Sequence, residues 1–444
     1  MGVAEVLFRA ARPRLADAHL LDREDGAQLF LVDGSRLFDI DSDIAEAVRE
    51  AFADPTGGSL RALMTEYGLE GRGAISAEPP RRFAVRALSL AIAQKCNLGC
   101  TYCYAQGGEF GQPAKSMTEE TARAAVDLLL EETKPGERAN LAFLGGEPLV
   151  AREALRRTTV YAAERAAGRG VRLTFSITTN GTLLRADDAA FFEEHGFAVT
   201  LSLDGIGTAH DRLRPFKTGA SSYDRIVERA KPLLETQRRM QVSARVTVTP
   251  ANLALRETLD AFVALGFHSV GFSPMLSAPS ERHEMEARDL ALMLAEMVSC
   301  ADAFEEHLRA GRRYPFANLL NALREIHKGT HRPYPCGAGA GYLGVSADGD
   351  LAACHRFVGD EAGAMGDLVR GVDRERQSAW LAGRHVDRQQ PCSGCWARYL
   401  CGGGCHHETL SRGRPACDFI RGWLHHSIKV YGRLSRDRLL DRVL

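Results

Sequence analysis

The cysteines of this sequence gather in two groups. Eleven cysteines occur in 444 residues: three lie in Cys96-Asn-Leu-Gly-Cys100-Thr-Tyr-Cys103, Cys300 stands alone, and seven lie between residues 336 and 417. Grouped cysteines in a chain without an export signal are typical of metal or cluster ligation, whereas disulfide frameworks are typical of small secreted domains. The first group has the spacing CxxxCxxC and only three thiolates. A closed zinc site needs four ligands, whereas three thiolates on a four-iron cluster leave one iron open.

Alternating strand and helix patterns surround the first cysteine group. Apolar runs followed by helical periodicity recur six times between residues 85 and 310. Repeated βα units with right-handed crossovers predict a parallel sheet that curls into a partial barrel. Its first helix is expected to start at a capping box, Ser116-Met-Thr-Glu119. The expected strands are 87–93, 140–144, 172–178, 198–203, 242–248 and 269–274.

Three of these strands alternate polar and apolar residues. A period of two places one set of side chains on each face of a strand, and a polar face with an arginine favours a polar ligand in the barrel lumen. An exposed antiparallel sheet is the alternative, which the intervening helices disfavour. The polar set is Thr174, Ser176, Thr178, Thr200, Ser202, Asp204, Ser243, Arg245 and Thr247.

The two ends of the chain differ from this middle part. Residues 27–33 and 35–41 are expected to form a hairpin around Asp33-Gly34, followed by helices over 41–52 and 60–67 and a linker at 71–73 and 78–82. Beyond residue 330, cysteine, glycine and histidine become frequent and regular periodicity falls. We expect bound metal to stabilise this last segment, because little of it can build an apolar core.

CxxxCxxC after the first strand, with Gly145-Gly-Glu-Pro148 after the second, resembles the radical S-adenosylmethionine (radical SAM) enzymes. The resemblance implies a [4Fe–4S] cluster on Cys96, Cys100 and Cys103. It also implies one-electron cleavage of S-adenosylmethionine and abstraction of a hydrogen atom from substrate. The residues that it places against S-adenosylmethionine are Gly145, Gly146, Glu147, Pro148, Thr179, Asn180 and Ser202. Arg245, on the polar strand face, is expected to meet the carboxylate of S-adenosylmethionine or an acid of the substrate; a structural ion pair is the alternative.

The second cysteine group resembles the SPASM extension of these enzymes, which holds two auxiliary [4Fe–4S] clusters. Together with the cluster on Cys96, Cys100 and Cys103, the two auxiliary clusters bring the expected number to three. An eighth cysteine found in some relatives is absent, so one auxiliary iron is expected to be open or to be completed by His331 or another group. A zinc ribbon is the alternative for this segment. By resemblance, one cluster has Cys392, Cys395, Cys401 and Cys417 as ligands, and the other has Cys336, Cys354 and Cys405.

The resemblance also predicts domains and a substrate. It implies a peptide-recognition-like α+β domain at 1–82, a partial (β/α)6 radical SAM barrel at 83–312 and a SPASM domain at 313–444. Enzymes of this kind mostly modify peptides and proteins. An extended leader peptide is expected to add a strand to the first domain; a structural cap over the barrel is the alternative role.

The residue after Cys354 bears on the product. Sulfatase-maturing relatives carry a catalytic aspartate there, whereas this sequence has His355. The surrounding residues most resemble the family that matures quinohemoprotein amine dehydrogenase, which implies thioether bonds between cysteine sulfur and Asp or Glu methylene carbons in the small subunit. His355 or Asp204 is the candidate base. Carbon–carbon crosslinking, epimerisation and formylglycine formation are the alternatives, as is a non-catalytic zinc scaffold.

The composition of the chain excludes some classes of binding partner. A formal net charge of −1 argues against bulk attraction to nucleic acid or an anionic membrane, and no run of 18 apolar residues occurs. No signal peptide is evident, and many thiolate ligands suit a reducing cytoplasm. The expected partners are a protein or peptide substrate and a flavodoxin or ferredoxin electron donor.

Overall fold

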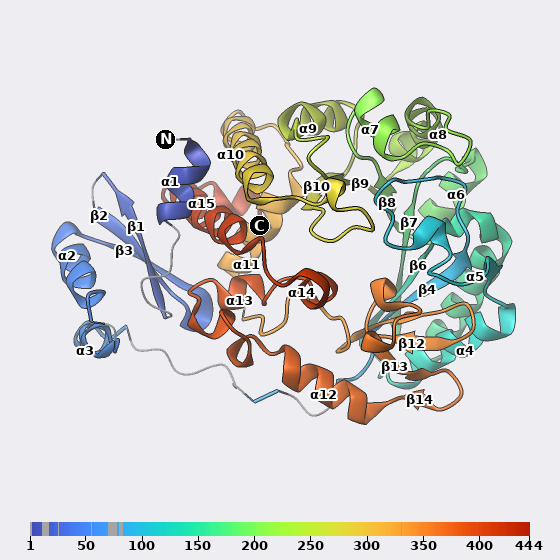
Figure 1. Cartoon of the computed structure of the whole chain (residues 1–444), viewed down its shortest axis with the longest axis horizontal. Coiled ribbons are helices and arrows are strands. Elements are labelled where there is room, and N and C mark those ends of the chain that lie inside the picture. Colours follow the sequence, from blue (N-terminus) through green and yellow to red (C-terminus); the bar gives the residue numbers. More distant parts are fainter. Residues whose placement is uncertain are drawn as a thin grey trace. The chain divides into compact units, whose positions relative to one another are not determined.

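The computed structural model describes residues 2–10, 17–24, 26–54, 56–69, 78–79, 83–329 and 331–444. Two compact units are formed, and Figure 1 labels their elements. The barrel unit consists of Pro80–Met285 and Gly337–Leu381. The helical unit consists of Met1–Pro79, Glu286–Cys336 and Ala382–Leu444.

A parallel sheet forms the centre of the barrel unit. Its parallel strands lie side by side in the order β10-β9-β8-β7-β6-β4. All the expected strands are present, so the prediction of a parallel α/β sheet is confirmed. Their bounds are β4 Ala87–Gln94, β6 Arg138–Gly145, β7 Arg172–Thr179, β8 Ala198–Ser202, β9 Gln241–Val248 and β10 Ser269–Pro274.

Helices connect these strands and pack on the apolar face of the sheet. In β7, Phe175 and Ile177 are buried, whereas Thr174 and Ser176 on the opposite face are accessible. This alternation is the one that the sequence predicts. The connecting helices are α4 Glu119–Glu131, α5 Arg152–Gly168, α6 Ala186–Glu194, α7 Thr208–Leu213, α8 Tyr223–Thr236 and α9 Leu255–Ala264.

The expected cap of the first helix was wrong. The side chain of Thr118, and not that of Ser116, accepts the bond from the N–H of Thr121 and begins α4. Ser116 belongs to a short strand, β5 Lys115–Ser116, which pairs antiparallel with β4. The hydroxyl of Thr118 is better placed because it lies directly before the first helical residue.

A late segment extends the same sheet. β11 Tyr342–Val345 pairs parallel with β4, and β12 Asp350–Ala352, β13 Ala364–Asp367 and β14 Gly371–Val372 follow antiparallel. Gln94, at the end of β4, accepts a bond of 2.7 Å from the N–H of Ala347. Residues 337–381 therefore belong to the barrel unit by their contacts, and α12 Arg374–Arg384 follows them. This division differs from the predicted borders at 82 and 312, because short glycine-rich strands give no clear pattern in the sequence.

The helical unit contains a three-stranded antiparallel sheet in the order β1-β2-β3. β2 Gly26–Leu31 and β3 Arg36–Ile40 form the predicted hairpin, and Gly34 in the turn has a φ of 71°. α2 Ser42–Ala51 and α3 Gly58–Glu66 are the predicted helices, whereas β1 Ala18–Arg23 was not predicted. The linker expected at residues 71–73 lies outside the described residues.

Long helices complete the helical unit. α15 Cys417–Arg436 contacts α1 Val3–Ala10, α10 Ala287–Arg309 and α11 Ala317–His327. The expectation that the last segment builds little core was wrong, because α15 buries Trp423, Leu424 and Ile428. Shorter helices are α13 Arg398–Cys401 and α14 His406–Arg412.

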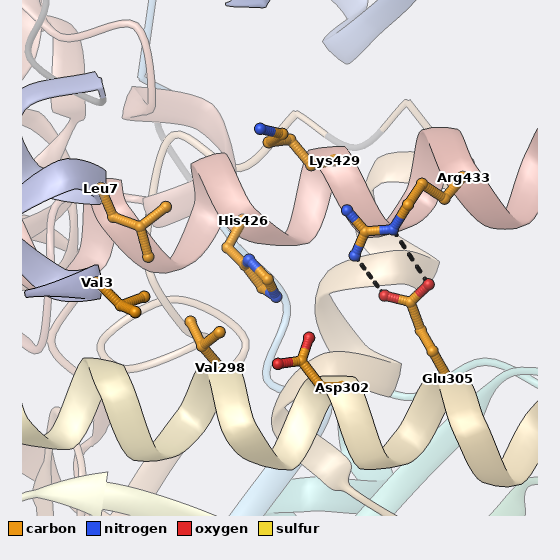
Figure 2. A pocket seen from close by; sticks show the side chains of 8 residues that line it. All are labelled: Val3, Leu7, Val298, Asp302, Glu305, His426, Lys429 and Arg433. Atoms are coloured by element: carbon orange, nitrogen blue, oxygen red, sulfur yellow. Dashed lines mark hydrogen bonds and ion pairs between the residues drawn. The ribbon is translucent and has the colours of Figure 1, made fainter. Parts of the chain in front are cut away.

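A cavity of about 510 Å³ lies between α1, α10 and α15 in the helical unit (Figure 2). Val3, Leu7 and Val298 line its apolar part. At its other end the guanidinium of Arg433 pairs with the carboxylate of Glu305. None of the described helices is both long and apolar enough to cross a membrane.

Candidate active site

The loop that carries the first cysteines begins where β4 ends. The backbone N–H groups of Gly99 and Thr101 donate to the carbonyls of Pro215 and Leu213, at 2.8 and 3.0 Å. These bonds fasten the loop to the segment that follows α7. The sequence prediction of a cysteine loop at the carboxyl edge of the sheet is therefore confirmed.

The Gly-Gly-Glu-Pro segment lies directly against this loop. The N–H of Gly146 donates to the carbonyl of Ala93 at 2.8 Å, and that of Glu147 donates to the carbonyl of Lys95 at 2.9 Å. A Cβ atom on Gly146 would lie 2.4 Å from the carbonyl oxygen of Lys95 and 2.8 Å from Cα of Gly108. Only glycine lets the two backbones approach so closely.

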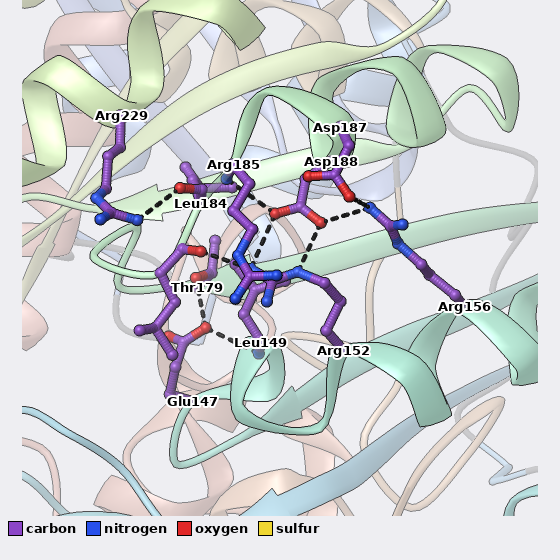
Figure 3. Close-up of polar contacts among 11 residues, drawn as sticks. Glu147, Leu149, Arg152, Arg156, Thr179, Leu184, Arg185, Asp187, Asp188 and Arg229 are labelled. Atoms are coloured by element: carbon purple, nitrogen blue, oxygen red, sulfur yellow. Dashed lines mark hydrogen bonds and ion pairs between the residues drawn. The ribbon is translucent and has the colours of Figure 1, made fainter.

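Glu147 is fully buried, and protein groups bind both of its carboxylate oxygens; Figure 3 shows its bonds to Thr179 and Leu149. Oε1 accepts from the hydroxyl of Thr179 at 2.7 Å and from the N–H of Leu149 at 3.0 Å, and Oε2 accepts from the N–H of Asn180 at 2.7 Å. Burial raises the pKa of Glu147, and these three bonds oppose that rise. The side chain thus connects two loops, and its predicted contact with S-adenosylmethionine remains a prediction.

A second buried carboxylate holds the same two loops (Figure 3). Asp188, at the start of α6, accepts from Nε and Nη2 of Arg152 at 2.9 and 3.0 Å and from Arg156 at 3.0 Å. Arg152 begins α5, immediately after the short helical turn Pro148–Ala151. The bidentate pair therefore fixes the chain that follows the Gly-Gly-Glu-Pro segment to the start of α6.

Ser202 and Arg245 lie on the accessible face of the sheet. Ser202 ends β8 and is paired in register with Arg245 of β9. Arg245 is exposed and Ser202 is half-buried. Both face the same side as Thr174 and Ser176, as the period of two predicts.

Asp204 is buried, and its carboxylate is already occupied. Oδ1 accepts the N–H of Thr247 at 2.8 Å, and Oδ2 accepts the hydroxyl of Tyr102 and lies 3.6 Å from Nη1 of Arg214. Burial raises the pKa of Asp204, while Arg214 and Tyr102 oppose that rise. These contacts favour a positioning role for Asp204 over the predicted role of base.

Tyr102 and Arg214 were not among the predicted site residues. Tyr102 stands between the second and third cysteines, and Nη1 of Arg214 donates to its hydroxyl at 2.7 Å. Among the residues that the structure describes, the buried Nε of Arg214 has no hydrogen-bond partner. The position of Tyr102 inside the cysteine motif could have drawn attention to it, whereas Arg214 lies on a loop that gives no periodic signal.

The residues of this region fit a cluster with a bound cosubstrate. Burial raises the pKa of Cys96 and raises that of Cys100 to about 12, with Arg214 opposing both. Thiols in such surroundings favour the deprotonated form only when a cation binds them. The close approach of the two loops at Gly146 leaves backbone surface for a ligand. The Nε of Arg214, which has no partner among the described residues, leaves a hydrogen-bond donor for an anionic group.

His355 also lies in the barrel unit, beside the segment that follows Cys103. Its Nδ1 is 2.8 Å from the hydroxyl of Tyr342, which is 2.8 Å from the hydroxyl of Ser89. The ring of Tyr104 lies 6.0 Å from that of His355, measured between centroids. Burial raises the pKa of Tyr104, and the nearby thiols of Cys103 and Cys354 raise it further.

Four thiols gather in the helical unit. Cys401 is half-buried, and its pKa rises to about 11 through desolvation and the nearby thiols of Cys392, Cys395 and Cys417. Arg421 lies near Cys395, and this thiol helps to raise the pKa of the guanidinium. No three His, Cys, Asp or Glu side chains in the described part of the chain converge as a single metal ion requires. A [4Fe–4S] cluster differs in binding each thiolate to a separate iron.

The remaining predicted ligands are divided between the units. Cys336 and Cys405 belong to the helical unit, and Cys354 belongs to the barrel unit. His331, the candidate for completing that cluster, packs edge-on against Tyr399 with ring centroids 4.2 Å apart. Its role as a ligand stays a prediction.

Comparisons with known proteins show similarity to one superfamily. Residues 90–260 match the Radical SAM superfamily model. The structure resembles that of anSMEcpe with bound AdoMet, with a TM-score of 0.64 and 19% identity over 80% of this chain and 99% of that one. Part of the barrel unit is thus similar to the Radical SAM superfamily, and the fold is that of a protein with bound AdoMet.

Two further similarities are to a protein of similar sequence and to a protein of similar fold. The sequence is 28% identical to a serine-type anaerobic sulfatase-maturating enzyme of Klebsiella aerogenes, over 74% of this chain and 82% of that protein. The fold also resembles Streptococcus suis SuiB bound to the precursor peptide SuiA, with a TM-score of 0.53 and 14% identity over 89% of this chain and 96% of that one.

Proposed function

We propose that this chain is a radical SAM enzyme that oxidises a residue of a peptide or protein substrate. The main support for this proposal is the contact between the cysteine loop and the Gly-Gly-Glu-Pro segment. This contact places the loop with the three thiols against the backbone of the glycine segment. In it, Cys96, Cys100 and Cys103 hold the cluster. Bound there, the cluster and S-adenosylmethionine supply one-electron cleavage of the sulfonium and abstraction of a hydrogen atom.

The protein's own groups orient the cosubstrate. The backbone of residues 145–148 binds its amino group, and Thr179, Asn180 and Ser202 lie at the strand ends around it. We assign its carboxylate to Arg214 in place of Arg245, because the Nε of Arg214 is buried and unsatisfied beside Cys96 and Cys100. Substitution of Arg214 by Lys should raise the KM for S-adenosylmethionine at least tenfold, about 1.4 kcal/mol, while substitution of Arg245 by Lys should not.

The second cysteine group would hold the two auxiliary clusters. The mutual proximity of Cys392, Cys395, Cys401 and Cys417 supports a four-thiolate site. Cys336, Cys354 and Cys405 are the proposed ligands of the other cluster. Iron and sulfide analysis of anaerobic protein should give about twelve irons per chain, falling to about eight when the first three cysteines are replaced by Ala.

Formylglycine formation is the finer activity that the relatives support best. Oxidation of serine to an aldehyde removes a hydrogen atom, a proton and one further electron from the side chain. His355 is the proposed proton acceptor, because Asp204 is occupied by Tyr102, Arg214 and Thr247. An auxiliary cluster is the proposed acceptor of the electron. The test is to incubate enzyme, S-adenosylmethionine and reductant with a serine-containing or cysteine-containing sulfatase peptide and to trap the aldehyde with a hydrazide.

Thioether formation is the second candidate, and His355 is the observation that favours it. This position carries aspartate in sulfatase-maturing relatives, so the change of base points to another reaction. The proposed substrate is the small subunit of quinohemoprotein amine dehydrogenase. A thioether consumes a free thiol and lowers the mass by about two hydrogens per bond, whereas an aldehyde reacts with hydrazide and no thioether does.

The sheet β1-β2-β3 is the proposed site for an extended segment of the substrate. β2 is central, so β1 and β3 are its edges, and an added strand gains affinity from main-chain hydrogen bonds. A proline in place of Phe38, in β3, should weaken peptide binding if this edge is used.

A flavodoxin or ferredoxin is the proposed electron donor.

A further inference from the structure

Asn180 belongs to a closed ring of hydrogen bonds beside the first cysteine. Its Nδ2 donates to Oδ1 of Asn97 at 2.9 Å, and Nδ2 of Asn97 donates to the hydroxyl of Thr182 at 2.8 Å. That hydroxyl donates back to Oδ1 of Asn180 at 2.7 Å. Asn180 and Thr182 are both buried, so the ring is shielded from competing water.

The ring fixes which way the amide of Asn180 points. Its oxygen accepts from both the hydroxyl and the backbone N–H of Thr182, the latter at 2.9 Å. The NH₂ group must therefore face the opposite side, where it meets Asn97 and Cys96. Nδ2 lies 3.6 Å from Sγ of Cys96, within the range of an N–H···S bond.

Cys96 differs from Cys100 and Cys103 in the hydrogen-bond donors that reach its sulfur. Its sulfur also accepts the backbone N–H of Leu98 at 3.5 Å, so two donors point at one thiolate. Within the described residues, no such donor reaches the sulfur of Cys100 or Cys103. The electrostatic environment of the three thiols is therefore unequal.

We propose that Asn180 raises the reduction potential of the cluster that Cys96 helps to hold, and that Asn97 and Thr182 are the positioning residues that keep its amide aimed at the sulfur. The proposal rests on the ligand role of Cys96 under the proposed function. Reduction adds negative charge to a cluster and its thiolates, and a hydrogen-bond donor at a thiolate stabilises the reduced form. Because the ring is already formed, the donor needs no reorganisation when the electron arrives. A small donor protein then reduces the cluster more easily.

The test is a potentiometric titration of the anaerobic, full-length enzyme followed by electron paramagnetic resonance. The signal that changes on addition of S-adenosylmethionine identifies the relevant cluster among the three. Asn180→Leu should move its midpoint to a more negative potential. Thr182→Val keeps Asn180 but opens the ring, so it should move the midpoint in the same direction by less.

Asn140→Leu is the matched control. Asn140 is a partly buried asparagine of β6 in the same sheet, and its Nδ2 donates to the hydroxyl of Ser176 at 3.2 Å. Its replacement should leave the midpoint unchanged. An unchanged midpoint in both Asn180→Leu and Thr182→Val, with iron content equal to wild type, would overturn the proposal. If Asn180→Leu fails to assemble the cluster, Thr182→Val alone decides the outcome.

The same measurements separate this proposal from the proposed function. Cys96→Ala should abolish the signal that responds to S-adenosylmethionine. Its persistence would overturn the ligand assignment, and the proposal for Asn180 with it. Loss of that signal in Cys96→Ala, together with no shift in the Asn180 and Thr182 variants, would overturn the role of Asn180 alone.

Discussion

The hydroxyl of Thr179 donates a bond of 2.7 Å to Oε1 of Glu147, which links the end of β7 to the loop that follows β6. Thr179→Val removes this donor and leaves a buried carboxylate with two bonds in place of three. A hydrogen bond to a charged group contributes about 1.5–3 kcal/mol, so we expect a loss of that order in the free energy of unfolding. Chemical denaturation of anaerobic protein measures it.

Thr200→Val, on the neighbouring strand, is the control for this prediction. Thr200 is half-buried on the accessible face of the sheet. Its replacement should change stability by less than about 0.5 kcal/mol. Equal losses in the two variants would mean that the bond to Glu147 contributes nothing specific.

Gly146→Ala tests the close approach of the two loops. The new methyl group would lie 2.4 Å from the carbonyl oxygen of Lys95, and backbone cannot yield as a flexible side chain does. We expect the sheet to form but the loops to separate, so that iron bound per chain falls by about four. Iron analysis and circular dichroism of the variant check both parts.

Gly168→Ala serves as the comparison, because nothing lies within 4 Å of a Cβ at that helical position in α5. It should retain all its iron and gain up to about 1 kcal/mol of stability from helix propensity. Full iron content in Gly146→Ala as well would show that the close contact at Gly146 tolerates a side chain.

The fold could be predicted where periodicity is strong, and less well elsewhere. The alternation in 172–178 and 242–248 fixed both the strands and their accessible face. The cysteine spacing located the loop after β4. The strands β11–β14 are short and rich in glycine, so the addition of residues 337–381 to the sheet left no periodic signal.

Site residues that act through other residues were the hardest to predict. Arg214 reaches the cysteine loop only because the segment after α7 bonds to Gly99 and Thr101. No spacing rule in the sequence encodes that contact. Conversely, Asp204 lies where the strand pattern placed it, but its carboxylate is bound by three groups that the pattern could not reveal.

The stability of the helical unit should fall with acid because of a buried histidine pair. Nε2 of His19 lies 2.8 Å from Nδ1 of His425, and burial lowers the pKa of His425 to about 3. The ordinary pKa of histidine is 6.5, so between these two values the unfolded chain binds a proton that the folded chain does not. Stability conferred by neutral His425 is complete above pH 6.5 and declines as the pH falls toward 3.

His425→Gln should reduce this dependence. We expect wild type to lose more unfolding free energy than the variant between about pH 7.5 and about pH 5.5. The half-exposed His195, changed to Gln, is the control and should behave as wild type. Parallel losses in wild type and His425→Gln would assign the acid sensitivity to other groups.

Arg214 and Asp204 should be energetically coupled. Both are buried, and they are bridged by the hydroxyl of Tyr102. Arg214→Met leaves the carboxylate of Asp204 without its cation, and removal of one partner of a buried pair costs about 3–5 kcal/mol.

Asp204→Asn leaves the guanidinium unpaired in the same way. The double variant removes both charges, so it should lose less than the sum of the single losses, with a coupling of about 1–3 kcal/mol in unfolding free energy. Arg245→Met, on the exposed face, should show no coupling to Asp204→Asn. Additive losses at Arg214 and Asp204 would mean that other groups hold the cation and that the two residues are not an energetically coupled pair.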